Sequence, residues 1–124
     1  MRVFKNAWFV RFARKEKISA KALWDAVERA EQGQIDADLG GGVIKQRIAR
    51  LGEGKSKGYR SIVLYRKDDK AFFVFGFPKN EMANIREDEE VQFKKMAKQV
   101  LALSDTQLQL LINNGQFEEV VKDA

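Results

Sequence analysis

The chain has 124 residues, the size of a single domain and enough to bury a hydrophobic core without covalent staples. It contains no cysteine and no histidine, which excludes a disulfide framework, a cysteine-based zinc site and the commonest general base. The net charge is +5, no apolar run reaches the length of a membrane span and the N-terminus has no signal-peptide core, so we expect one cytoplasmic domain (1–124) that acts away from membranes.

Two helices are predicted in the first third of the chain. Asn6 can cap a helix in which Trp8, Phe9, Phe12 and Ala13 share one face. Ser19 is a good N-cap for a second helix, which ends at Gly33. The apolar residues of both helices, including the tryptophans, are expected in the core.

A glycine-rich loop, residues 35–42, leads into three predicted strands. The strands cover roughly residues 43–49, 59–66 and 71–77, and residues 67–70 form a hairpin-like turn between the last two. The third strand has no polar face, so it should be central and covered on both sides. Asp36 and Asp38 in the loop are two lone carboxylates, typical of loop solvation, and we expect no metal site and no cofactor.

The pattern after Pro78 is helical again. Four acids at 87–90 suit the first turn of a helix, and Ser104 with Gln107 forms a capping box for a short last helix that stops near Gly115. The tail at 117–121 has no clear assignment, and the C-terminal helical segment (about 104–124) is a candidate for mobility. These elements predict an α+β fold in which helices pack on one side of a small, mostly antiparallel sheet.

Basic residues are concentrated in the predicted strands. Residues 43–66 contain seven bases and one acid, whereas residues 81–124 contain nine acids and five bases. This local excess favours binding of a polyanion, although charged side chains also protect a solvated sheet edge against aggregation.

The basic residues are expected to converge at one end of the sheet. Lys45 and Arg47 are two apart on one strand and therefore share a face. The other candidates for the same surface are Arg50, Lys55, Lys57, Tyr59, Arg60, Lys79 and Asn80. Tyr59 and Tyr65 are either stacking platforms for bases or ordinary strand aromatics. Convergent cations suit a phosphodiester chain better than one small acidic substrate.

The tripeptide Gly54-Lys55-Ser56 resembles part of the phosphate-binding loop of nucleotide hydrolases, but the match fails. The motif needs a glycine where this chain has Ala49, and it needs a helix after Lys-Ser, where a strand is predicted.

The segments "GKSKGYR" and "FPKNE", within residues 43–81, carry a resemblance to the RelE-like toxins of bacterial type II toxin–antitoxin modules, close to their HigB branch. The likeness covers roughly residues 1–104. It implies a microbial-ribonuclease-like fold, a ribosome-dependent mRNA endonuclease that cuts mRNA in the ribosomal A site, and a cognate antitoxin, which we expect to be of helix-turn-helix type. The family's active face matches Lys45, Arg47, Arg60, Lys79 and Asn80 here, with Lys55 and Lys57 between them.

The chain departs from the family pattern further on, where several members use an aromatic residue or an acid and this chain has Asn84 and Ile85. The resemblance therefore does not identify a general base.

RNA supplies its own nucleophile, the 2′-hydroxyl, so cations that orient it and stabilise phosphorane charge are sufficient for an endonuclease. We assign transition-state clamping to Arg60 and Arg47, and proton acceptance to Lys45 or Lys57. Two alternatives stay open: a DNA gyrase inhibitor like the ParE branch, and a nucleic-acid-binding relative without catalysis.

Overall fold

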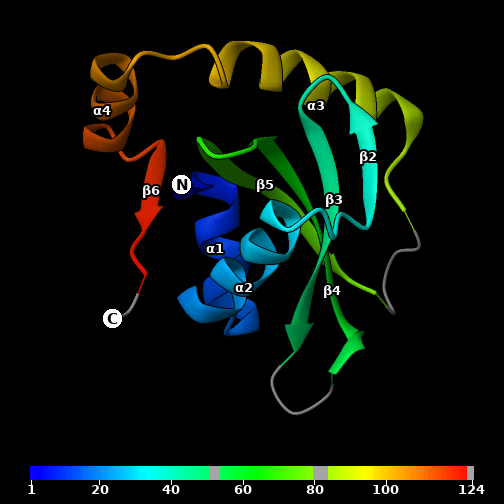
Figure 1. Cartoon of the computed structure of the whole chain (residues 1–124). Coiled ribbons are helices and arrows are strands. Elements are labelled where there is room, and N and C mark those ends of the chain that lie inside the picture. Colours follow the sequence, from blue (N-terminus) through cyan, green and yellow to red (C-terminus); the bar gives the residue numbers. More distant parts are fainter. Residues whose placement is uncertain (51–53, 80–83, 123–124) are drawn as a thin grey trace.

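The computed structural model describes residues 1–50, 54–79 and 84–122, with residues 54–57 described by their backbone only. Within these residues the order of elements is β1 (Arg2–Asn6), α1 (Ala7–Glu16), α2 (Ala20–Glu31), β2 (Ala37–Gly40), β3 (Val43–Arg50), β4 (Gly54–Arg66), β5 (Lys70–Pro78), α3 (Glu87–Val100), α4 (Asp105–Asn113) and β6 (Phe117–Val120). Figure 1 shows them as a twisted sheet with helices around it. The α+β class is confirmed.

The strands form one six-stranded sheet in the order β2-β3-β4-β5-β1-β6. The pairs are antiparallel except for β1 with β5, which run parallel. β5 lies between β4 and β1, and most of its residues are buried, as expected for a strand without a polar face. This confirms the central position of β5.

Helices cover both faces of the sheet, whereas the sequence predicted helices on one side. The α1–α2 pair packs on one face over a core that includes Phe9, Leu23 and Ile48. α3 and α4 pack on the other face over a second core that includes Phe72 and Leu108, and α3 lies above β2 and β3 in Figure 1. A central strand that is apolar on both sides requires this second layer.

Local signals explain where the helices begin. The Asn6 side chain accepts a hydrogen bond from the Phe9 N–H, and the Ser19 hydroxyl accepts one from the Ala22 N–H. Ser104 and Gln107 form a reciprocal capping box at α4. α3 starts after Arg86 with four acids in its first turn, which is the sign that a helix N-terminus prefers. The predicted caps at Asn6, Ser19 and Ser104 are confirmed.

Three segments differ from the sequence-based expectation. Residues 37–40, predicted as loop, form β2 and pair with β3 across an irregular register. β4 begins at Gly54 rather than at Tyr59, so the basic "GKSKG" segment continues the strand. The unassigned tail forms β6, which pairs with β1. Glycine-rich and charged segments have low intrinsic strand propensity, so pairing with a neighbouring strand decides their conformation.

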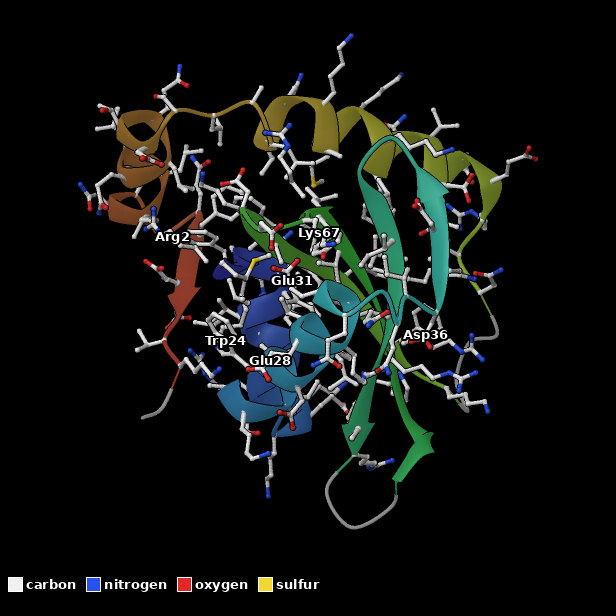
Figure 2. The ribbon with its side chains drawn as sticks, in the orientation of Figure 1. Arg2, Trp24, Glu28, Glu31, Asp36 and Lys67 are labelled. Carbon is white, nitrogen blue, oxygen red and sulfur yellow. The ribbon has the colours of Figure 1, made fainter. Side chains whose placement is uncertain are left out.

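Side chains hold β6 at the edge of the sheet. The Arg2 guanidinium donates two hydrogen bonds to the Glu119 carboxylate, at 3.0 and 2.9 Å. The Trp24 indole N–H donates to the Val120 carbonyl at 3.0 Å, and Figure 2 shows Trp24 beside this strand. The last strand is therefore tied both to β1 and to α2.

Candidate nucleic-acid interface

The alternation of side chains along β3 separates a core face from a cationic face. Ile44 and Ile48 belong to the core beneath α1 and α2, and Gln46 between them is buried. Val43 belongs to the core beneath α3. Lys45 and Arg47 alternate with the core residues in the same way as Val43, so they lie on the α3 face of the sheet. The sequence predicted that these two residues share a face, but not which face.

The register of β3 with β4 adds a third cation to this face. Arg47 is directly opposite Arg60, and Lys45 is opposite Ile62. Directly opposed residues in an antiparallel pair project to the same side. Lys45 and Arg60 are half-buried and Arg47 is exposed. We call Lys45, Arg47 and Arg60 the cation triad.

The triad lines a small depression of about 140 Å³. Its lining residues are Asp36, Ala37, Lys45, Gln46, Arg47 and Arg60. Within the part of the chain that the structure describes, the three cationic groups form no ion pair. Their charge is therefore available to an anion at the surface.

The carboxylate of Asp36 in this depression is engaged by the scaffold. It accepts a hydrogen bond from the Arg47 backbone N–H at 2.6 Å and lies 3.9 Å from an Arg29 guanidinium nitrogen. Arg29 also donates to the Arg47 carbonyl. Figure 2 shows Asp36 just before β2, beside β3. Asp36 and Arg29 thus hold the backbone of Arg47 and leave its side chain at the surface.

Gln46 fixes β3 from the opposite face. Its side-chain amide donates to the Ala26 carbonyl at 2.9 Å and to the Gln34 carbonyl at 3.0 Å, and its amide oxygen accepts from the Asp36 N–H at 3.1 Å. Gln46 is only 2% exposed, and its side-chain amide makes all three of these hydrogen bonds to the backbone. One buried side chain therefore joins α2, the start of β2 and the strand that carries two members of the triad.

Gly58 allows β4 to approach β3 closely just before Arg60. A Cβ atom at this position would lie 2.0 Å from the Ile48 carbonyl oxygen, which is backbone and cannot rotate away. The Gly58 carbonyl also accepts from the Lys79 N–H at 3.3 Å. The exposed Lys79 therefore follows β5 at the same end of the sheet as Arg60, as predicted.

Two residues predicted for RNA contact lie elsewhere. Tyr59 is 3% exposed, packs in the core beneath α1 and α2, and donates its hydroxyl to the Glu16 carbonyl. Arg50 lies over the Tyr59 ring at 5.7 Å, and both line a hollow beside the α1–α2 turn. Tyr59 points away from the triad because it has the opposite parity to Arg60 along β4. The prediction that its ring stacks on bases is wrong for this structure, and Arg50 is not part of the triad's depression.

Tyr65 is also an ordinary strand aromatic in its contacts. Its hydroxyl donates a hydrogen bond to Glu31, and burial together with this bond raises the pKa of Tyr65 above its usual value. The remaining predicted residues, the Lys55 and Lys57 side chains and Asn80, lie outside the described part of the structure.

The structure adds a residue that sequence reasoning did not place in the site. The Lys45 ammonium donates to the Asn84 side-chain oxygen at 3.0 Å. Asn84 is 39 positions further along the chain and precedes α3. The sequence flagged it only as a departure from a family pattern, since no local signal links it to β3.

The fold and the site together define a class: a small α+β protein whose mixed sheet carries a group of cations, without ion pairs among the described residues, that suits a polyanion. None of the helices among the described residues is long and apolar enough to cross a membrane.

The family model described as "RelE toxin of RelE / RelB toxin-antitoxin system" matches residues 1–120, and the chain belongs to this RelE toxin family. It is therefore a toxin of a toxin–antitoxin system, and the family implies an antitoxin as its partner. A search of curated proteins returned no match.

Proposed function

We propose that this toxin is a ribosome-dependent endoribonuclease that cleaves mRNA in the ribosomal A site and so inhibits translation. The observation that carries the proposal is the cation triad, in which Lys45, Arg47 and Arg60 share one face and none is neutralised by a described carboxylate. Membership of the RelE family supports the same reading. A HigB-like branch within the family remains a prediction.

The proposed reaction uses the nucleophile that RNA already carries. The 2′-hydroxyl loses its proton to a proton acceptor and its oxygen attacks the adjacent phosphorus. The bond to the 5′-oxygen of the next nucleotide breaks and that oxygen takes a proton from water, so a 2′,3′-cyclic phosphate and a 5′-hydroxyl end result. Negative charge builds on the phosphorane oxygens during attack, and preorganised donors aimed at those oxygens lower the barrier. Arg47 and Arg60 face each other across β3 and β4, so they can grip the phosphate from two sides.

Proton transfer needs a group beside the clamp. Lys45 is two residues from Arg47 on the same face of β3, which supports it as a proton acceptor when its head group is the neutral amine. Lys57 is the other candidate. Its side chain lies outside the described residues, so the choice between the two lysines rests on experiment.

The shape of the site supports dependence on the ribosome. The depression of about 140 Å³ is smaller than typical small-molecule pockets of about 300–1,000 Å³. A depression this small can contact a phosphate but has too little surface to orient a flexible RNA strand. Holding the reacting atoms in line accounts for a large part of a catalysed rate, and the ribosome already holds mRNA in a fixed path.

We further propose that the antitoxin, of helix-turn-helix type, neutralises the toxin by covering the triad or by displacing the segment from Ser104 onward. An acidic antitoxin segment would complement the triad, and its affinity should weaken as salt is added.

The test is induced expression of the toxin followed by mapping of mRNA 5′ ends, with DNA gyrase supercoiling assayed in parallel. We expect new 5′ ends within translated codons, loss of protein synthesis, and unchanged supercoiling. Inhibited supercoiling with intact mRNA would instead support a gyrase inhibitor. Arrest without either change would support a relative that binds nucleic acid and does not cleave it.

A further inference from the structure

Asn84 makes two hydrogen bonds with one oxygen atom. Its Oδ1 accepts from the Lys45 ammonium at 3.0 Å and from the Ile85 backbone N–H at 2.9 Å. The first bond reaches β3 from the segment that enters α3, and the second fixes the side chain against its own backbone. The ammonium is therefore held by a carbonyl oxygen whose position is itself fixed.

The orientation of this amide follows from the chemistry of its two partners. An ammonium and a backbone N–H are both donors, so only the carbonyl oxygen of the amide can satisfy them. Ile85 strengthens the arrangement, because its side chain packs against the core beneath α3. Ile85 thus anchors this segment to the core, and the neighbouring Asn84 oxygen fixes the position of the Lys45 head group.

We infer that Asn84 is a positioning residue for the reaction proposed above: it holds the Lys45 head group beside the Arg47–Arg60 pair without adding a negative charge there. The inference rests on the proposed function, because it assigns Asn84 a role in cleavage. Lysine has a flexible stem with about 2 kcal/mol of rotamer entropy, so an unheld head group would sample many positions. Because the fixed acceptor already orders the head group, Lys45 loses less rotamer entropy when RNA binds.

The identity of the residue supports the inference. An aspartate could accept the same two hydrogen bonds, and it would also form an ion pair with Lys45. That ion pair would reduce the positive charge that the triad offers to a phosphate. A neutral acceptor orients the Lys45 head group and adds no negative charge beside the Arg47–Arg60 pair.

The experiment measures single-turnover cleavage of mRNA on programmed ribosomes at increasing toxin concentration, which separates the maximal rate from the apparent affinity. The variants are Asn84→Ala, Asn84→Asp, Lys45→Ala and the double variant Asn84→Ala with Lys45→Ala. Asn113→Ala on α4 serves as the control for loss of an asparagine side chain. Circular dichroism and thermal unfolding confirm that each variant is folded.

Asn84→Ala should lower the maximal rate about two- to tenfold, the value of one typical net hydrogen bond. In the Lys45→Ala background the same change should have almost no effect, because residues that act through one contact are not additive. Asn84→Asp should unfold at the wild-type temperature and still lose at least as much activity as Asn84→Ala. Asn113→Ala should cleave like the wild type.

Three results would overturn the inference while leaving the proposed function intact. Full activity of Asn84→Ala would show that Lys45 needs no holding. An equal loss in both backgrounds would mean that Asn84 acts independently of Lys45. Full activity of Asn84→Asp would show that the neutrality of the acceptor does not matter. If the wild-type toxin itself does not cleave, the proposed function fails and the inference fails with it.

Discussion

Replacing Gly58 with alanine should separate β3 and β4 beside the cation triad. The new Cβ would lie 2.0 Å from the Ile48 carbonyl oxygen, whereas an ordinary contact is 3.4 Å or more. The strands must therefore move apart locally by about 1.4 Å, which stretches an N–H···O bond from about 2.9 Å to beyond 4 Å. Losing about two ladder bonds and straining the backbone should cost about 2–4 kcal/mol of unfolding free energy.

Thermal unfolding followed by circular dichroism measures this effect. For a domain of this size, a cost of about 2–4 kcal/mol corresponds to a fall in the midpoint of about 8–16 °C. Gly33→Ala is the matched control: Gly33 has open space around it and a φ of +85°, so only backbone strain of about 1 kcal/mol applies. Because Gly58 precedes Arg60 by two residues, cleavage by the folded Gly58→Ala variant should also fall. A midpoint equal to that of Gly33→Ala or higher would refute the close-approach argument.

Two further substitutions test the scaffold and its charges. Gln46→Ala removes three hydrogen bonds that the buried side chain makes to the backbone, and it should cost about 3 kcal/mol in urea unfolding. The exposed Gln99→Ala should stay within about 0.5 kcal/mol, and equal midpoints for the two variants would contradict this role. The Arg2 guanidinium lowers the pKa of Glu119, so their interaction stabilises the fold above about pH 4.5 and is lost as pH falls through the lowered pKa. Both side chains are more than a third exposed, so Glu119→Gln should cost less than about 1 kcal/mol of unfolding free energy at pH 7. The difference in unfolding free energy between this variant and the wild type should vanish on acidification. A difference that does not change with pH would argue against the ion pair.

Local chemistry made much of this fold predictable. The caps at Asn6, Ser19 and Ser104 depend on residues three positions away, and the turn before β5 depends on four consecutive polar residues. The alternation that puts Lys45 and Arg47 on one face follows from strand geometry alone.

Features that depend on distant pairing were not predictable in the same way. The strand at residues 37–40 is short and leads into three consecutive glycines, and it forms because it pairs with β3. The burial of Tyr59 follows from the position of the α1–α2 layer, which a strand pattern does not reveal. Asn84 reaches Lys45 only because the segment before α3 returns over β3. Sequence spacing carries no signal for such contacts.

The central claim is that Arg60 stabilises the transition state of mRNA cleavage, and single-turnover cleavage on programmed ribosomes tests it most directly. Arg60→Ala should reduce the maximal rate about a hundred- to a thousandfold, and Arg60→Lys should recover little, because lysine lacks the planar fork that grips two phosphate oxygens. Lys55→Ala, in the basic segment that precedes Arg60, should mainly weaken binding and its salt dependence. Equal losses for Arg60→Ala and Lys55→Ala, confined to binding, would contradict the catalytic role of Arg60 and leave the triad as an anchor for RNA.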